Sequence, residues 1–374
     1  MLDAKVPPII IRLIINTYQK QTADVRWKGK YSQEFKLSNG VKQGAVLSPL
    51  LFCFYMNDIF KIMKESKNGC FIGNYYAGVF GYADDLLLLC PSRKGLQDML
   101  TIAENYAKDH NISYSTNINP IKSKTKGIVF TNSQNKPDPV KVCLNGNPLP
   151  WIDSAKYLGN KITSSINGLH EDILIKRAKF IERNSELLQE FYFAHPELLC
   201  KLNKIYNSSF FGSVLWDLTS RNVNMIINSW SVSVRYMWGL PLQAHKNLIE
   251  PLGGIHAKNM IYTRFLKFVQ SIKESERPAP YYLLEKIKND ANTITGKNLT
   301  HILGNEGKDV FNIDIRKFTK NIALCHPIEN NSWKVNLIKE LTNLKLNLLG
   351  VQFSDGDELN RNEIQEMINY VSTC

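Results

Sequence analysis

The chain has no cysteine arrangement of the kind that builds a disulfide framework or a zinc site. Its seven cysteines are scattered over 374 residues, no Cys-x-x-Cys pair occurs, and no histidine is spaced to complete a set of zinc ligands. This distribution is typical of reduced thiols inside a cell. It argues against a disulfide-rich secreted domain and against a Cys/His zinc knuckle.

Long apolar runs, a leader segment and internal repeats are also missing. No stretch reaches the roughly 18 apolar residues that a membrane-spanning helix needs, and Met1–Pro8 does not have the layout of a signal peptide. We therefore expect an intracellular protein of the nucleus or cytoplasm, neither secreted nor embedded in a membrane.

The composition is that of a folded protein with surplus positive charge. Hydrophobic residues make up 44% of the chain and aromatic residues 10%, and the formal net charge is +12. Residues 1–274 contain 34 Lys and Arg against 21 Asp and Glu, whereas residues 275–374 contain 12 against 13. A basic surplus of this kind is typical of a nucleic-acid-binding surface, although a merely soluble basic protein would give the same count.

Two adjacent carboxylates, Asp84 and Asp85, stand between two short apolar segments. Val79 and Phe80 precede them and Leu86–Leu89 follow, a pattern that predicts two buried strands with the acids at the turn. Two interpretations are open. The pair is either a solvated hairpin tip, since Asp is common in turns, or a site at which hard oxygen ligands hold a divalent metal.

A second motif lies about forty residues upstream. Gly40 and Gly44 bracket a loop, and glycines there let the backbone approach a ligand closely. Ser48 is a favourable N-cap and Pro49 suits the first helical position, so a helix is expected from Leu50 to about residue 64. Taken alone, this is an ordinary entry from a loop into a helix.

Together the two motifs resemble those of reverse transcriptases, with Gln43-Gly44 in the loop and Tyr-Ala-Asp-Asp at residues 82–85. The resemblance is closest to the non-LTR (LINE-like) retrotransposons of animals. From about residue 5 to residue 161 the order and spacing of motifs follow that family, and residues 183–274 resemble its thumb and the helical region after it. The last hundred residues resemble nothing we can name.

The resemblance implies RNA-directed DNA synthesis that uses two Mg²⁺ ions, with an RNA template, a DNA primer and deoxynucleoside triphosphates as partners. In the family, the residues corresponding to Asp84 and Asp85 are catalytic metal ligands. Those matching Gln43 and Gly44 lie at the incoming nucleotide, and the one matching Tyr82 lies near the primer end. The hairpin matching Tyr157, Leu158 and Gly159 grips the primer. Nothing in the sequence indicates an oligomeric state.

A lysine after the catalytic hairpin is also implied, where it would neutralise or protonate the departing pyrophosphate. The segment from Asn119 to Thr125 matches this part of the family. Its register is ambiguous, because the spacing from Asn119 favours Lys122 whereas the spacing to Thr125 and Phe130 favours Lys124. We choose Lys124. Without the resemblance, these lysines would be interpreted as a solvated charged face.

One family feature has no match. Reverse transcriptases carry a further catalytic aspartate in a segment roughly 25 or more residues before the helix that here begins at Pro7 and Pro8. Only five residues precede Val6, and Asp3 lacks the surrounding pattern. We expect an N-terminally truncated domain that does not polymerise by itself. The alternative is a non-catalytic nucleic-acid-binding remnant of a retroelement, and a group II intron maturase is a weaker third possibility.

The remaining pattern predicts an α+β fold: a partial palm with an antiparallel sheet in residues 1–165, a helical thumb and connection in residues 166–274, and a helical tail in residues 275–374. Within it we expect a helix capped by Ser92 and a type I′ turn at Asn145-Gly146. Strands are expected at residues 112–114 and 128–130, helices at 170–191, 199–218, 230–238 and 260–271, and a linker at 274–280.

Overall fold

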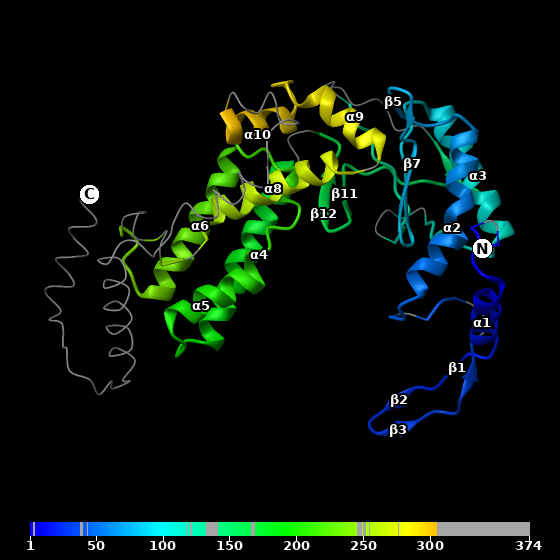
Figure 1. Cartoon of the computed structure of the whole chain (residues 1–374), viewed down its shortest axis with the longest axis horizontal. Coiled ribbons are helices and arrows are strands. Elements are labelled where there is room, and N and C mark those ends of the chain that lie inside the picture. Colours follow the sequence, from blue (N-terminus) through cyan, green and yellow to red (C-terminus); the bar gives the residue numbers. More distant parts are fainter. Residues whose placement is uncertain are drawn as a thin grey trace, which may run out of the picture. The chain divides into compact units, whose positions relative to one another are not determined.

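A computed structural model describes residues 1–304 of the chain with short gaps (Figure 1). The gaps fall at residues 3, 38–39, 43, 118, 120–121, 132–140, 166–168, 245–248, 250–251, 254 and 276. The chain divides into two compact units. The first consists of the described parts of Met1–Gly127 and Pro137–Trp151, and the second of those of Ile128–Lys136 and Ile152–Cys374.

The first unit begins with helix α1 (Pro8–Gln19), which starts at the predicted prolines. None of its residues is buried, and its apolar side chains, such as those of Ile9 and Leu13, are largely exposed. Two short antiparallel ladders follow, one nested inside the other along a single hairpin. They join β1 (Thr22–Ala23) to β4 (Phe35–Lys36) and β2 (Arg26–Trp27) to β3 (Lys30–Tyr31).

The core of the first unit lies between α2 (Ser48–Glu65), α3 (Arg93–Asp109) and the inner face of a β-hairpin. That hairpin is formed by β7 (Val79–Tyr82) and β8 (Asp85–Leu88), and a smaller one by β5 (Phe71–Ile72) and β6 (Tyr75–Tyr76) precedes it. The buried side chains come from the two helices at helical spacing. They are those of Met56, Ile59, Met63, Met99, Ala103 and Tyr106.

The two predicted helix caps have different outcomes. Ser92 is confirmed as the N-cap of α3, because its Oγ accepts a hydrogen bond from the backbone N–H of Gly95 at 3.2 Å. The prediction for Ser48 is wrong, since α2 begins at Ser48 itself with Leu47 as its N-cap. The buried Ser48 hydroxyl instead donates to the carbonyl of Lys42 at 2.7 Å and therefore holds the loop against the helix.

The type I′ turn is confirmed between β9 (Cys143–Leu144) and β10 (Asn147–Pro148). Asn145 and Gly146 both have positive φ, 53° and 73°, as that turn requires. The strands predicted at residues 112–114 and 128–130 are wrong, because neither segment joins a ladder among the described residues. Ile112 and Tyr114 pack against the α2–α3 core from a segment without strand pairing, so their apolar alternation reflects burial.

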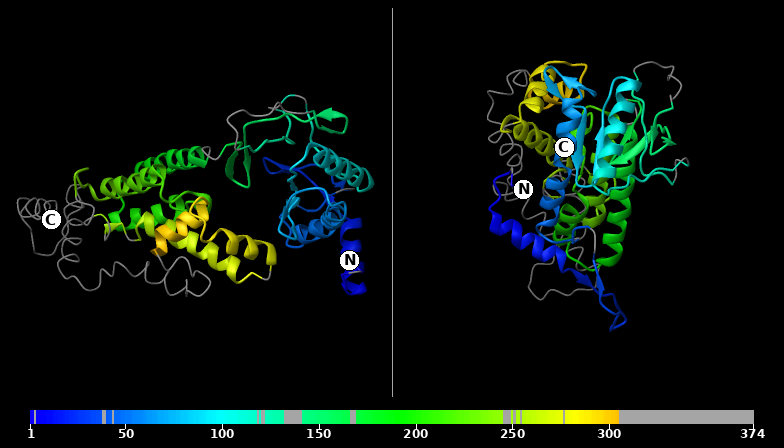
Figure 2. Two further views of the ribbon diagram at one scale, coloured as in Figure 1. Left: turned by 90° about the horizontal axis from the view of Figure 1, so that it is seen from above. Right: turned by 90° about the vertical axis from the view of Figure 1, so that its right-hand side faces the viewer.

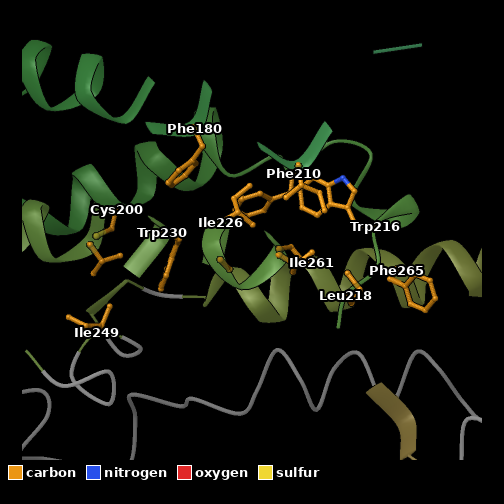
Figure 3. Close-up of a cluster of buried hydrophobic side chains, with 14 of the residues drawn as sticks. Phe180, Cys200, Phe210, Trp216, Leu218, Ile226, Trp230, Ile249, Ile261 and Phe265 are labelled. Atoms are coloured by element: carbon orange, nitrogen blue, oxygen red, sulfur yellow. The ribbon is translucent and has the colours of Figure 1, made fainter. Parts of the chain in front are cut away.

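The second unit is built around three helices that lie side by side (Figures 1 and 2). They are α4 (Leu169–Glu190), α6 (Arg221–Trp238) and α8 (Ala257–Lys273), so three of the predicted helices are confirmed. Figure 3 shows part of their shared core, including the aromatic side chains of Phe180, Phe210, Trp216, Trp230 and Phe265. The hairpin of β11 (Ser154–Tyr157) and β12 (Asn160–Thr163) packs on α4.

The single helix predicted for residues 199–218 is wrong. The structure has α5 (Pro196–Leu202), a π-helical turn η2 (Asn203–Asn207) and a 3₁₀ turn η3 (Ser213–Leu215). Phe210 and Gly212 between them have φ values of 42° and 82°, which no right-handed helix contains. A Cβ at Gly212 would lie 1.9 Å from Asn160 Oδ1, so the break also requires glycine there.

Two more helices, α9 (Pro278–Ile287) and α10 (Ile294–Leu303), join the same core. Their Leu284, Leu299 and Leu303 side chains are buried in it. The predicted linker is therefore short, since α9 already begins at Pro278, a favourable first helical position. Residues 305–374 lie outside the described part, and the proposed three-domain division stays a prediction.

The described residues combine helices with small antiparallel sheets, which confirms the α+β class. Within this part of the chain, every helix is too short or too polar to cross a lipid bilayer.

Candidate functional site

The two adjacent carboxylates lie at the tip of the β7–β8 hairpin. Tyr82 pairs with Asp85 as the last rung of the ladder, which leaves Ala83 and Asp84 as the two turn residues. Ala83 has φ 50°, the left-handed value that the first central residue of a tight hairpin turn requires. The predicted turn position is confirmed for Asp84, whereas Asp85 is the first residue of β8 beside the turn.

The inner face of this hairpin is fixed by packing. Val79, Leu86 and Leu88 contact the α2–α3 core, because side chains of one strand alternate between faces and those of paired residues share a face. Gly81 belongs to the same face. A Cβ there would lie 2.4 Å from Cζ of Phe60 on α2, so the absence of a side chain lets the helix approach the strand.

The outer face of the hairpin carries the polar chemistry. Asp85 shares this face with Phe80 and Tyr82, which are 46% and 65% exposed, and both Asp84 and Asp85 are exposed. Neither carboxylate is engaged in an ion pair or a side-chain hydrogen bond with another described residue, so both can bind a ligand. Carboxylate oxygens are the ligands that Mg²⁺ prefers.

The base of the hairpin is tied to the rest of the unit by main-chain hydrogen bonds. The N–H of Leu89 donates to the carbonyl of Gly78 at 2.8 Å, and the N–H of Cys70 donates to the carbonyl of Leu89 at 2.9 Å. The Tyr76 hydroxyl donates to the carbonyl of Asn68 at 2.8 Å. Burial, and next the thiols of Cys90 and Cys70, raise the pKa of this hydroxyl, which keeps it protonated as a donor.

Exchanging Gly81 for alanine should lower the free energy of unfolding of the first unit by about 1–3 kcal/mol, because the new Cβ overlaps the Phe60 ring. Urea denaturation followed by circular dichroism measures this loss. Combining Gly81→Ala with Phe60→Leu should cost less than the two single substitutions added together. Additive effects, or a Gly81→Ala variant as stable as the original chain, would contradict the tight contact.

The glycine loop before α2 is exposed. Gly40 and Gly44 have φ values of 94° and 83°, and a Cβ at either would meet no atom within 4 Å. The requirement for glycine here is therefore backbone conformation and not crowding. Gln43 lies outside the described residues.

The lysines after the hairpin lie on one exposed side of their segment. Lys122, Lys124 and Lys126 are exposed, whereas Ser123 between them is buried. The Ser123 hydroxyl donates to the carbonyl of Thr125 at 2.6 Å and accepts from a main-chain N–H, so it anchors the segment. Because Lys122 and Lys124 are both exposed, the register of the predicted motif lysine stays open and Lys124 stays a prediction.

The predicted primer-gripping residues form the turn between β11 and β12. Leu158 and Gly159 have φ values of 45° and 81°, the pair of left-handed values that defines a type I′ turn, and Tyr157 pairs with Asn160 beside it. This hairpin belongs to the second unit, whereas Asp84 and Asp85 belong to the first.

Sequence reasoning found the residues of the hairpin tip but not those that position them. Gly81 could have been found, because a glycine inside an otherwise bulky apolar strand often marks a close approach of another element. The role of Ser48 as a brace for the loop, rather than as a cap, depends on the tertiary contact with Lys42 and has no local signal.

Comparison with known proteins identifies the first part of the chain. Residues 1–162 match the family model for reverse transcriptase (RNA-dependent DNA polymerase). A Pol polyprotein of the type-2 retrotransposable element R2DM of Drosophila melanogaster is 35% identical over 94 residues, which are 25% of this chain and 9% of the relative. The probable RNA-directed DNA polymerase of the Drosophila X-element is 30% identical over 141 residues, 36% of this chain and 14% of the relative.

A third relative is the Pol polyprotein of the type-1 retrotransposable element R2 of Nasonia vitripennis. It is 31% identical over 112 residues, 30% of this chain and 10% of the relative. The matches thus span at most about a seventh of the curated relatives' length. Residues 1–162 are a reverse transcriptase domain. It is of the type found in non-LTR, LINE-like retrotransposons.

Proposed function

We propose that this chain contributes catalytic carboxylates to an RNA-directed DNA polymerase that extends a DNA primer on an RNA template. The observation that carries the proposal is the exposed Asp84-Asp85 pair at a hairpin tip, inside the residues that match the reverse transcriptase family. Members of that family use divalent metal ions in general, and we propose Mg²⁺ here.

The donor set at the hairpin tip suits a hard cation. Asp84 and Asp85 offer oxygen ligands that no described cation already occupies, and Asp84 would bind the metals directly while Asp85 would support them. When bound, the metal ions would lower the pKa of the primer 3′-hydroxyl and neutralise charge on the triphosphate. Tyr82, on the same face as Asp85, would lie beside the primer end.

The other site residues have separate proposed roles. Gln43 and Gly44 would border the incoming nucleotide, Lys124 would neutralise the pyrophosphate, and Leu158-Gly159 with Tyr157 would contact the primer backbone. The open space around Gly44 supports a close approach of ligand to main chain there. We further propose the palm, thumb and tail division given above and an intracellular location, in nucleus or cytoplasm, which the scattered cysteines support.

A non-catalytic nucleic-acid-binding protein is the second candidate, and one observation favours it. Among the described residues, no group of three His, Cys, Asp or Glu side chains is close enough to hold a metal ion. Asp84 and Asp85 are thus only two of the ligands that a six-coordinate Mg²⁺ takes. Metal binding and catalysis therefore need separate tests.

Mn²⁺, as a spectroscopic substitute for Mg²⁺, should bind the purified chain at the hairpin tip, and Asp84→Asn combined with Asp85→Asn should abolish that binding because the carboxylate ligands are gone. Electron paramagnetic resonance of free Mn²⁺ measures the change. The control carries Asp24→Asn and Asp58→Asn, which removes the same charge from exposed positions elsewhere. Equal Mn²⁺ affinity in both double variants would show that Asp84 and Asp85 are solvated residues of the hairpin tip and not metal ligands.

A further inference from the structure

The second unit contains a cavity of about 430 Å³ next to the proposed primer-contacting turn, and Gly159 of that turn is part of its lining. Its walls are the β11–β12 hairpin, one side of α4, and the irregular segment at residues 207–211. Three apolar side chains from the hydrophobic core, those of Phe180, Phe210 and Ile226, line it as well. This volume lies in the range of pockets that hold one small organic ligand.

One side of α4 gives the cavity its charge. Asp172, Lys176, Lys179 and Arg183 recur at a spacing that aligns them along one helix face. Lys176 is neutralised, because its Nζ lies 2.7 Å from the buried Asp172 carboxylate, which also accepts from the main-chain N–H of Lys161 at 3.0 Å. Lys179 and Arg183 are exposed and make no ion pair within the described part of the chain.

The hairpin wall adds a further unneutralised cation. Lys156 and Lys161 are directly paired across β11 and β12, so both side chains lie on one face of the hairpin. Lys161 is ion-paired with Glu171 on α4, whereas Lys156 has no acidic partner among the described residues. Like charges directly opposite each other destabilise a hairpin, and an anion bound beside them would offset that repulsion.

A buried donor without a partner lines the same cavity. Asn207 is only 8% exposed, and its Nδ2 makes no hydrogen bond to any described residue. An unpaired buried amide costs about 1–3 kcal/mol, so its retention at a cavity wall points to a ligand with an acceptor oxygen. The side chain lies in the π-helical turn η2, a deviation from α-helix that often occurs at functional sites.

An exposed aromatic ring also lines the cavity. Phe211 is 56% exposed although it follows the buried Phe210, and it lines the cavity beside the turn residue Gly159. A Cβ on Gly159 would lie 3.0 Å from the Phe211 ring, so the glycine lets the ring lie close against the turn. The Nζ of Lys176 lies 5.7 Å from the centroid of the same ring, which places positive charge beside the aromatic surface.

We propose that this cavity binds one unpaired nucleotide of a single-stranded nucleic acid. Its phosphate would contact Lys156, Lys179 and Arg183, its base would stack on Phe211, and a base oxygen would accept from Asn207 Nδ2. Base stacking on an exposed ring requires an unpaired base, since both faces of a base inside a duplex are covered by its neighbours. The inference does not rest on polymerase activity, and most of these residues lie outside the 1–162 match.

The first test measures binding of a fluorescent 12-nucleotide single strand to the full chain by anisotropy, in EDTA so that metal plays no part. Lys179→Ala combined with Arg183→Ala should weaken binding about tenfold or more. The slope of log affinity against log salt concentration should become shallower by about 0.7 for each phosphate that is no longer neutralised. The control, Lys201→Ala with Lys204→Ala, removes equal charge from exposed positions outside the cavity. Equally weakened binding in both double variants would overturn the proposal.

Variants at two further positions separate the ligand contacts from folding. Phe211→Ala should weaken binding about tenfold while Phe211→Tyr retains it, because stacking needs the ring. Asn207→Leu should weaken binding without lowering the melting temperature, since it removes an unpaired buried group; a structural role would instead lower that temperature.

The nature of the ligand is tested in the same assay. A single strand carrying iodouracil should cross-link under ultraviolet light to the peptide that contains Phe211, and mass spectrometry locates the product. An unlabelled duplex, or a free nucleoside monophosphate at the same nucleotide concentration, should compete at least tenfold less well than the unlabelled single strand. Equal competition by either one, or cross-linking only elsewhere in the chain, would overturn the proposal.

Discussion

Primer extension on an RNA template, with the purified 374-residue chain and Mg²⁺, is expected to give no template-dependent product. The described part of the chain places only Asp84 and Asp85 at the hairpin tip, without a third potential metal ligand close by. In-line nucleotidyl transfer with two metal ions needs both ions clamped. Loss of a shared ligand should cost several kcal/mol of transition-state stabilisation, which is about 10³-fold or more in rate.

The experiment is then repeated with the missing segment supplied as a second polypeptide. Adding a separate polypeptide that carries the family's further aspartate segment should produce extension, and Asp84→Asn should then abolish it. The matched control is Asp58→Asn, an exposed acid on α2 that should leave the restored activity intact. Product formed by the chain alone and lost in Asp84→Asn would show that another acid in the chain completes the site, contrary to the expectation.

The Asn298→Ala substitution should lower the free energy of unfolding of the second unit by about 2–5 kcal/mol. Asn298 is fully buried on α10, and its Nδ2 donates to the carbonyl of Trp216 at 2.8 Å. Its Oδ1 accepts from the main-chain N–H of Leu218 at 2.9 Å. Alanine would leave both main-chain groups buried without partners, which is the costly way to lose a hydrogen bond.

Urea denaturation followed by tryptophan fluorescence measures this effect, because Trp216, Trp230 and Trp238 all lie in the core of the second unit. The control is Asn292→Ala, an exposed asparagine before α10, which should change the free energy of unfolding by less than about 0.5 kcal/mol. The same urea midpoint for Asn298→Ala and Asn292→Ala would show that the main-chain groups of Trp216 and Leu218 find other hydrogen-bond partners. The expected loss of unfolding free energy would then be wrong.

Features that depend on neighbouring residues could be predicted from the sequence. The Asn145-Gly146 turn and the Ser92 cap follow from the chemistry of two to four consecutive residues. The position of Asp84 and Asp85 at the tip of a hairpin follows from the apolar segments on both sides. The class of domain was predicted from the resemblance of its motifs to a known family. Hydrophobic periodicity alone would not have identified it.

Features that depend on distant contacts could not be predicted. Asn298 is 82 residues from the carbonyl that it binds, and nothing near it in the sequence marks it as buried. On α4, Lys176 is paired with Asp172, whose carboxylate also accepts from the Trp216 indole at 3.3 Å. The basic pattern alone cannot separate such a neutralised lysine from the exposed Lys179 beside it.

The contribution of α10 to the core of the second unit has a consequence during synthesis. Ile173 and Leu303, both buried in that core, are separated by about 130 residues. A ribosome that adds roughly 5–20 residues per second needs about 7–26 s to cover this distance. During that interval α4, and later α6, are made while the helix that pairs with Trp216 and Leu218 is still missing, so their apolar faces are open to chaperones and to aggregation until translation has passed α10.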